Sequence, residues 1–221
     1  MKKYLFPSLE NQSCKSFIWI LLVGDKANIT RVKSFFNFNL SFKYNILYQK
    51  SFKIYMKNLT KGNDILITTR IDYDDMIYYD AVNDVRKVIN KNKPALLCGY
   101  NSGLIYYELN NKYYNFPINY RNKGTTSIFA SLILILSKIK DSITIYDLGD
   151  HSLIRKNLFK KYKSLGIKNL NYEPANFDNG EVKFVWVRQN YSGVYNFSYN
   201  LLNKSQLKLF NFNLSNFYGK L

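Results

Sequence analysis

The chain alternates short apolar runs with segments whose apolar residues recur at helical spacing. The run FIWILLV at residues 17–23 is continuous rather than alternating, which is typical of a strand covered on both faces in a parallel sheet flanked by helices. Strands are predicted at residues 17–23, 44–48, 64–68 and 95–100, and helices at residues 5–14, 28–38, 51–59 and 76–89. This alternation of helix and strand predicts an α/β fold.

The second half of the chain predicts less regular structure. Residues 103–107 are expected to pair with the preceding strand through a turn at residues 101–102, and the polar, aromatic stretch 110–123 is expected to form a loop over a binding face. The apolar run 125–136 fits either a strand or a helix. Further strands are predicted at residues 143–146 and 184–187, a basic helix at 153–162, and an amphipathic helix followed by coil at 201–221.

Length and composition indicate one domain and a basic surface. The chain has 221 residues, of which 47% are hydrophobic, and this is enough for one sizeable core. We expect a single domain over residues 1–200 and a C-terminal tail over residues 201–221. The net charge of +17 favours polyanions, anionic membrane surfaces and phosphorylated substrates. Because the lysines are scattered along the whole chain, we discount this charge as a sign of nucleic-acid binding.

Cysteine content and hydropathy indicate in which cellular compartment the protein is expected to lie. Cys14 and Cys98 are the only two cysteines, which favours a reducing compartment. The longest apolar runs, residues 17–23 and 128–136, are well short of the roughly 20 residues that cross a bilayer. No signal-peptide pattern opens the chain. We therefore expect a cytoplasmic protein that can associate peripherally with the inner face of a membrane.

The densest acidic cluster follows the strand predicted at residues 64–68. TTRIDYDD at residues 68–75 holds three carboxylates in four residues, Asp72, Asp74 and Asp75. These charges repel one another unless a cation neutralises them, and Mg²⁺ or Mn²⁺ takes carboxylate oxygens while sharing its other positions with substrate phosphates. Ligands of open α/β sheets gather outside the carboxyl ends of strands. A metal site is one interpretation, and a solvated turn before a helix is the other.

Several segments together resemble the nucleotide-sugar half of GT-A-type glycosyltransferases, and the strongest likeness is to the rhamnosyltransferase family. TTRIDYDD at residues 68–75 looks like that family's TRLDNDD signature. The other segments that carry the resemblance are residues 7–13, the run 17–23 ending at Gly24 and Asp25, residues 62–66, and residues 144–146 followed by His151. The likeness covers roughly residues 5–155 of the chain.

The resemblance implies a role for each matching position. Asp25, at the end of the first strand, would face the base or ribose of a nucleotide. Asp72 and Asp74 would form a metal-binding pair, with Asp75 as an auxiliary group. Arg70 would contact the diphosphate, although from the residues alone a salt bridge to one of the aspartates is an equal interpretation.

His151 is the only histidine in the chain. The resemblance implies that its imidazole completes the metal shell or contacts the diphosphate, whereas a lone histidine is by itself more often a structural or surface group. An inverting transferase also needs a carboxylate base, and no position identifies itself as one. Glu108, Asp147 and Asp150 are candidates by location only.

The resemblance implies an enzyme that moves a sugar from a nucleotide-sugar donor to a polysaccharide or glycolipid acceptor, with Mn²⁺ or Mg²⁺ as cofactor. The implied fold is a GT-A-like, Rossmann-type mixed sheet flanked by helices. Because the chain starts at what matches the first helix, the strand that usually opens this sheet is expected to be missing. Two alternatives stay open: a basic module that binds nucleic acid or an anionic surface, and a truncated, inactive transferase.

Overall fold

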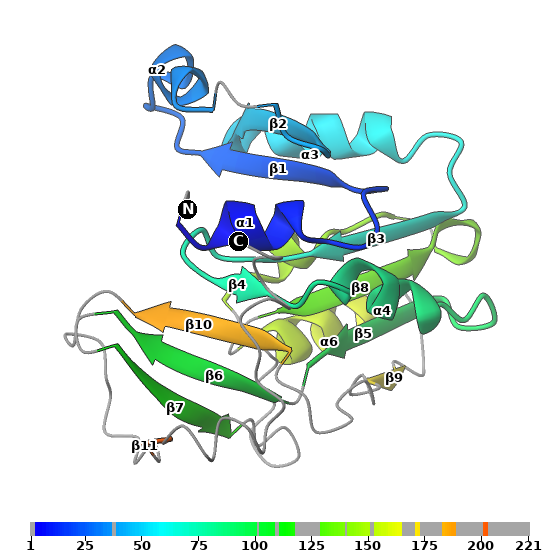
Figure 1. Ribbon diagram of the computed structural model, residues 1–221. Helices are drawn as coiled ribbons and strands as arrows, with labels where there is room; N and C mark the ends of the chain where they lie inside the picture. The colour runs from blue at the N-terminus through cyan, green and yellow to red at the C-terminus, as the bar shows by residue number, and fades with distance from the viewer. Residues whose placement is uncertain are drawn as a thin grey trace.

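The computed structural model of the protein describes most of the chain up to residue 164 and three short pieces beyond it. The described residues are 3–36, 39–100, 102–108, 111–117, 129–139, 141–150, 153–164, 171–172, 183–188 and 201–202. They form a mixed α/β fold in which parallel and antiparallel strand pairs are flanked by helices, as Figure 1 shows.

Helices and strands alternate through the first half of the chain. The helices are α1 (Leu5–Glu10), α2 (Ile29–Ser34), α3 (Gln49–Leu59), α4 (Ala81–Lys87) and α6 (Ile154–Ser164), with 3-10 turns η1 (Leu136–Lys138) and η2 (Ile145–Leu148). The strands are β1 (Ile18–Val23), β2 (Lys43–Tyr48), β3 (Ile65–Thr69), β4 (Met76–Ile77), β5 (Ala95–Gly99), β6 (Ser102–Tyr107), β7 (Lys112–Pro117), β8 (Ala130–Ile135), β9 (Asn171–Tyr172), β10 (Phe184–Arg188) and β11 (Leu201–Leu202).

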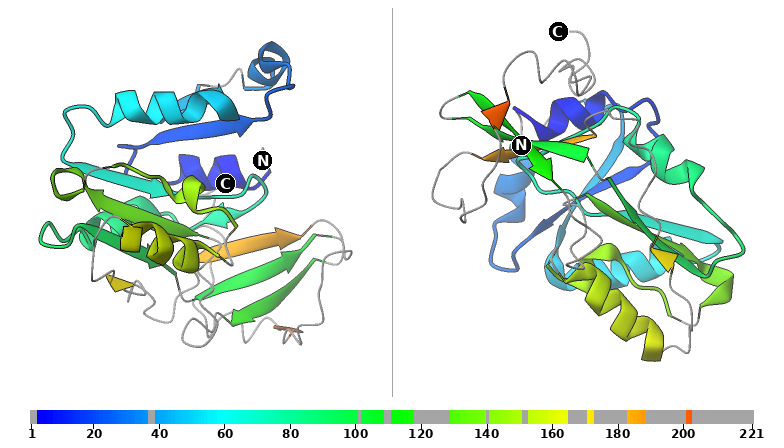
Figure 2. Two further views of the ribbon diagram at one scale, coloured as in Figure 1. Left: turned by 180° about the vertical axis from the view of Figure 1, so that it is seen from behind. Right: turned by 90° about the horizontal axis from the view of Figure 1, so that it is seen from below.

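The strands form separate sheets. β1 and β2 make a parallel pair, and a second sheet has the order β3-β8-β5-β9. A third sheet has the order β11-β7-β6-β10-β4. Helices α1 and α4 lie on one side of the first two sheets, and α3 and α6 lie on the other (Figures 1 and 2). This layering is the arrangement that an α/β chain uses to cover both faces of its strands.

The core is centred on β8 and β5. Every residue of both strands is buried. These strands therefore show none of the alternation of exposed and buried positions that is typical of a half-exposed sheet. Met56 of α3 and Leu158 of α6 belong to the same buried cluster as Leu132 of β8. The two helices therefore close one face of the β3-β8-β5 sheet.

The structure confirms most of the elements predicted for the first half of the chain. The strands predicted at residues 17–23, 44–48, 64–68 and 95–100 match β1, β2, β3 and β5 within one residue at each end. The side chain of Asn28 caps α2 by accepting a hydrogen bond from the Arg31 N–H at 3.0 Å. The basic helix predicted at residues 153–162 and the strand predicted at residues 184–187 are also present, as α6 and β10.

The predicted helix at residues 76–89 begins later than expected. Met76 and Ile77 instead form β4, which pairs antiparallel with β10, and both side chains are buried. The helix begins at Ala81. Ile77 fits the helical spacing, but pairing with a strand more than a hundred residues away decided the local structure of Met76 and Ile77.

The hairpin predicted around residues 101–102 is wrong. β5 pairs with β8 and β9, whereas β6 pairs with β7 and β10 in a different sheet. A strand buried on both faces has to satisfy its backbone groups on both edges, and β8 offers β5 a ladder along its whole length. Nearness in sequence therefore did not decide the pairing.

Two further predictions in the second half are corrected. Residues 112–117, expected within a loop, form β7, because tyrosine and phenylalanine favour a pleated surface. Residues 110 and 118–123 of that predicted loop lie outside the described residues. Residues 145–148 form η2 rather than a strand. Of the tail at 201–221, only β11 is described, and it is a strand rather than a helix.

Within the described part of the chain, no helix is both long and apolar enough to cross a bilayer.

Cys14 and Cys98 are free thiols. Cys98 is buried in β5, as expected for a small apolar side chain, whereas Cys14 is partly exposed and accepts a hydrogen bond from Arg86 at 3.1 Å.

Candidate functional site

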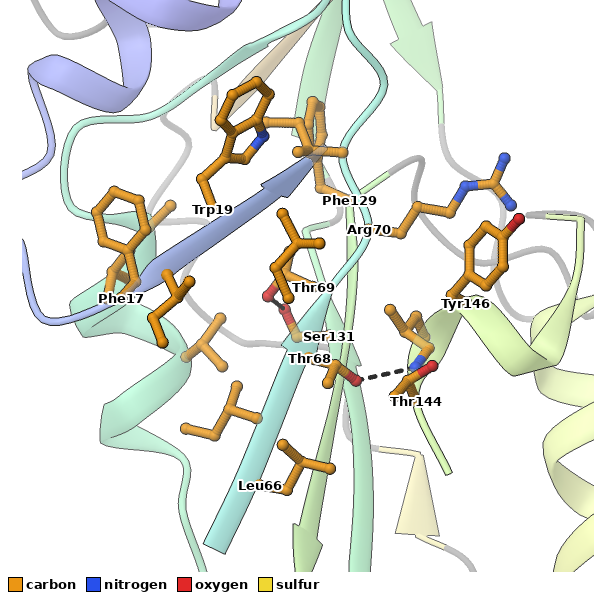
Figure 3. A pocket seen from close by; sticks show the side chains of 18 of the residues that line it. Phe17, Trp19, Leu66, Thr68, Thr69, Arg70, Phe129, Ser131, Thr144 and Tyr146 are labelled. Atoms are coloured by element: carbon orange, nitrogen blue, oxygen red, sulfur yellow. Dashed lines mark hydrogen bonds between the residues drawn. The ribbon is translucent and has the colours of Figure 1, made fainter. Parts of the chain in front are cut away.

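A cavity of about 940 Å³ lies between β1 and β3. Residues 17–22 form one wall and residues 65–73 form another. Figure 3 shows Phe17 and Trp19 on the β1 side, with Arg70 and Tyr146 on the opposite side. The volume is at the upper end of the range of roughly 300 to 1,000 Å³ that small-molecule sites occupy. This cavity is the candidate functional site.

Hydroxyl groups gather on the β3 side of the cavity. Thr68 Oγ1 accepts a hydrogen bond from the backbone N–H of Ile145 at 2.9 Å, which ties β3 to η2 (Figure 3). Thr69 Oγ1 and Ser131 Oγ are 2.7 Å apart and share a hydrogen bond across the β3-β8 pair. The carboxyl-terminal half of β3 is therefore polar, whereas its first residues, Ile65 to Ile67, are apolar.

Arg70 follows β3 directly and lines the cavity. Its Nη1 donates a hydrogen bond to the Gly149 carbonyl oxygen at 2.7 Å, and its Nε lies 3.6 Å from an oxygen of Asp72. The side chain is 29% exposed. The guanidinium has donors beyond these two contacts, so it can hold its position and still bind an anion.

The turn that holds Arg70 is built by a capping box. Thr144 Oγ1 and the Thr144 N–H both donate to Asp147 at 2.7 to 2.8 Å, and the Asp147 N–H donates back to Thr144 Oγ1. The turn ends at Gly149, whose φ of 75° suits glycine. The Thr-x-x-Asp spacing at 144–147 signals such a cap, and the prediction of a strand there missed it.

The three aspartates of the acidic cluster do not share one environment. Asp72 lines the cavity and is 37% exposed, whereas Asp75 is fully buried and Asp74 is half-buried outside the cavity lining. The Asp75 N–H donates to the Asp72 carbonyl at 3.3 Å, so a tight turn separates the two side chains. Among the described residues, no group of three or more His, Cys, Asp or Glu is placed to hold a metal ion.

Asp25 lies at the end of β1 but does not line the cavity. Its exposed carboxylate accepts a hydrogen bond from the Lys50 N–H at 3.2 Å, in the first turn of α3. Tyr48, the N-cap residue of α3, provides no side-chain hydrogen bond that caps the helix, since its hydroxyl donates to the Ala27 carbonyl instead. Asp25 therefore caps α3 from a neighbouring loop and adds a negative charge at the positive end of the helix dipole.

The remaining candidate residues do not line the cavity or lie outside the described residues. His151 lies outside the described residues. Glu108 forms an ion pair with Lys3, whose hydrogen bond lowers the pKa of the Glu108 carboxyl, and neither residue lines the cavity. Asp147 is engaged in the capping box, and Asp150 is exposed just beyond Gly149. The structure therefore brings Arg70 and Asp72 together, with Asp150 one residue beyond the carbonyl that Arg70 contacts.

Comparisons with protein-family models, with curated proteins and with solved structures found no match to this chain. The fold and the site thus define a class only: a mixed α/β protein whose cavity has an arginine and a carboxylate at the carboxyl end of a strand. The likeness to GT-A glycosyltransferases stays a prediction.

Proposed function

We propose that this protein is a GT-A-like glycosyltransferase that takes a sugar from a nucleotide-sugar donor and passes it to a polysaccharide or lipid-linked acceptor. The observation that carries the proposal is the pair Arg70 and Asp72, which lies in the cavity wall at the carboxyl end of β3. This is the edge of an α/β sheet at which ligands gather. The sequence resemblance of TTRIDYDD points to the same place.

Arg70 supplies the positive charge that this reaction needs. The bond to the sugar breaks as negative charge grows on the departing diphosphate, and a guanidinium already held in place stabilises that charge without reorganising. The Gly149 carbonyl fixes Arg70 by a hydrogen bond of 2.7 Å. Its ion pair with Asp72 is longer, at 3.6 Å, and is the contact that a phosphate oxygen would share or replace.

The carboxylates at this site suit a divalent ion only if the diphosphate supplies further oxygen ligands. Asp72 is the one carboxylate of the cluster in the cavity lining, and Asp74 is the neighbour that is not fully buried. One or two carboxylates suit Mg²⁺ or Mn²⁺ when substrate phosphates complete the shell. Such an ion would supply Lewis-acid stabilisation of the leaving diphosphate. The buried Asp75 would then support the turn instead of binding the ion.

Two exposed tyrosines complete the candidate donor site. Tyr73 is 59% exposed and Tyr146 is 41% exposed, although large aromatic side chains usually bury most of their surface, and both line the cavity. Tyr146 also contacts Phe52 edge to face, with ring centroids 5.6 Å apart, so one side of its ring is supported by α3. Aromatic faces of this kind stack on nucleobases and sugars, which suits a nucleotide-sugar donor.

The surface charge fits the partners proposed for this site. A net charge of +17 favours an anionic surface, and the inner face of a membrane would bring the enzyme to a lipid-linked acceptor. We propose a cytoplasmic protein that attaches peripherally there.

Calorimetric titration of the purified protein with a panel of nucleoside diphosphates, with and without Mn²⁺, tests the proposal. We expect saturable binding of at least one of them, strengthened by Mn²⁺. Asp72→Asn should reduce the effect of Mn²⁺, and Arg70→Ala should weaken binding by about 1.5 to 3 kcal/mol, as for the loss of a hydrogen bond to a charged group.

Matched controls lie elsewhere in the fold. Asp64 is exposed at the amino end of β3, and Arg31 is exposed on α2, so Asp64→Asn and Arg31→Ala remove the same charges away from the cavity. Neither control should change nucleotide binding. If no nucleoside diphosphate binds, or if the control variants weaken binding as much as the site variants, the proposal is wrong.

A further inference from the structure

Two helices that lie on the same side of the sheets, α3 and α6, have only lysine or arginine as charged residues. Their sequences are QKSFKIYMKNL and IRKNLFKKYKS, with no aspartate or glutamate. The left view of Figure 2 shows both helices on the near side of the strands. On the opposite side, α1 carries Glu10 and α4 carries Asp84, which offset the two basic residues of α4. The positive charge of the chain is therefore distributed unequally over the two sides of the sheets.

The turn η2 joins α3 and α6 into one continuous face. Tyr146 of η2 contacts Phe52 of α3 edge to face, and Lys161 of α6 donates a hydrogen bond to the Asp147 carbonyl of η2 at 3.0 Å. We call the outer surface of α3, η2 and α6 the α3–α6 face. Its exposed lysines on the described parts of the two helices are Lys50, Lys53, Lys57, Lys156 and Lys160.

Large apolar and aromatic side chains are exposed on the same face. Among the described residues, seven such side chains are exposed, and four of them belong to the α3–α6 face: Ile54, Tyr146, Leu153 and Phe159. Leu153 directly precedes α6. Side chains of this kind are usually buried, yet Phe159 is 58% exposed. Exposed apolar side chains that gather on one face indicate a surface that contacts a partner.

The lysines flank these apolar side chains at helical spacing. Residues three and four positions apart are neighbours on the surface of a helix. Ile54 has Lys50 four positions before it and Lys57 three positions after it. Phe159 has Lys156 three positions before it. A helix that lies on an anionic bilayer uses this pattern, because its apolar side chains enter the headgroup boundary while its lysines extend to the lipid phosphates.

A bilayer accounts for both parts of the pattern, whereas nucleic acid accounts for one. Lipid phosphates attract the lysines, and acyl chains remove the apolar side chains from water. Nucleic acid also supplies phosphates, but its bases stack on aromatic side chains and leave aliphatic ones such as Ile54 and Leu153 in water. The exposed aliphatic side chains therefore favour a lipid surface.

We propose that the α3–α6 face docks on an anionic lipid bilayer, with Ile54, Leu153 and Phe159 entering the headgroup boundary. Tyr146 links this face to the candidate site, because it is exposed on η2 and also lines the cavity beside Arg70 (Figure 3). Docking would hold the Tyr146 end of the cavity next to the bilayer, from which a lipid-linked acceptor would arrive. That role rests on the function proposed above, whereas the docking itself does not.

Sedimentation of the purified protein with lipid vesicles tests the docking. Vesicles of phosphatidylcholine alone are compared with vesicles of phosphatidylcholine and phosphatidylserine in a two-to-one ratio. We expect binding to the anionic vesicles to be at least about tenfold tighter and to weaken as salt rises. The double variants Lys53→Gln/Lys57→Gln and Lys156→Gln/Lys160→Gln should each lose about twentyfold in affinity, because each lysine near the membrane contributes about fivefold.

A separate variant tests the apolar contacts. Phe159→Ser should weaken binding to the anionic vesicles by about tenfold, because the phenyl ring no longer enters the bilayer. Phe35→Ser is its matched control, since Phe35 is exposed just beyond α2. Lys33→Gln/Lys91→Gln is the control for the lysine variants and removes exposed lysines from α2 and from the loop after α4. Neither control should change vesicle binding, and all these exposed substitutions should leave the fold intact.

Three results would overturn the docking. These are equal binding to both kinds of vesicle, equal losses in the control variants and in the variants of the α3–α6 face, and micromolar binding of duplex DNA through the same lysines without vesicle binding. The last result would assign the face to nucleic acid.

Nucleoside diphosphate titration of the same protein separates the docking from the proposed function. The substituted lysines do not line the cavity, so their variants should bind nucleotide as the wild type does. Vesicle binding without nucleotide binding would support the docking and contradict the proposed function. Nucleotide binding without vesicle binding would overturn the docking alone.

Discussion

At the scale of single residues, Asp80 shows how neighbouring hydrogen-bond donors keep a carboxylate ionised. Its carboxylate accepts hydrogen bonds from Ser13, from Asn83 at 2.9 Å and from Lys87 at 3.1 Å. Burial acts to raise the pKa of Asp80, and these hydrogen bonds outweigh it, so the pKa lies below the ordinary value of 3.8. The ionised carboxylate joins the loop before β1 to α4.

We predict that Asp80 makes the protein more sensitive to acid. A depressed pKa in the folded state contributes stability above pH 3.8, and this contribution disappears as the pH falls through the folded-state pKa. Asp80→Asn should cost about 1 to 2 kcal/mol at neutral pH, and the difference from wild type should shrink in acid. Urea unfolding at several pH values measures this, and a constant difference at all pH values would contradict it.

A second residue prediction concerns Asp25. Because its carboxylate caps the first turn of α3, Asp25→Ala should lower the free energy of unfolding by about 1 kcal/mol. Asp25→Asn keeps an acceptor oxygen and should cost less. Thermal unfolding of both variants checks the order. If Asp25→Ala leaves stability unchanged but weakens nucleotide binding, the side chain faces the ligand rather than the helix.

At the scale of elements, the central position of β8 sets the stability of the fold. β8 has β3 on one edge and β5 on the other, and α3 and α6 share its buried cluster. The apolar run at residues 125–136 was compatible with strand or helix on sequence alone. For residues 130–135, pairing on both edges decided in favour of a strand, because only an extended chain can satisfy both neighbours. Residues 125–128 of the run lie outside the described residues.

We predict that Leu132→Ala, in the middle of β8, lowers the free energy of unfolding by about 2 to 5 kcal/mol, because Leu132 is fully buried and its removal leaves a cavity. Ile54→Ala is the matched control, since Ile54 is 68% exposed on α3 and should change stability by no more than about 0.5 kcal/mol. Equal effects in urea unfolding would show that β8 is not central to the core.

At the scale of the whole molecule, charge and fold point to different partners. A net charge of +17 suits any polyanion, whereas the site proposed at the Arg70–Asp72 ion pair would take a small anionic ligand. The two interpretations predict a different dependence of binding affinity on salt concentration. Non-specific nucleic-acid binding weakens steeply as salt rises, because it releases counterions, whereas a ligand held in a cavity depends on salt less.

We predict that the protein binds duplex DNA no more tightly than a dissociation constant of about 0.1 mM at about 0.15 M salt, while nucleoside diphosphate binding persists there. Fluorescence anisotropy with labelled DNA, run beside the calorimetric titration, makes the comparison. Micromolar DNA affinity at that salt, together with no nucleotide binding, would favour the basic binding module instead.

The sequence by itself determined the elements whose pattern is local. The apolar run at residues 17–23, the Asn28 cap and the basic helix at 153–162 are all set by neighbours within a few positions, and β1, α2 and α6 confirm them. The sequence also placed the acidic cluster at the carboxyl end of β3, because strand and turn signals adjoin there.

Only the tertiary structure decided which segments meet. It paired Met76 and Ile77 with β10 and separated β5 from β6, since those choices depend on edges supplied by distant strands. It also split the aspartates, placing Asp72 in the cavity and burying Asp75, because a single turn directs neighbouring side chains into different surroundings. Sequence spacing describes one chain segment, whereas burial and pairing depend on every segment that packs against it.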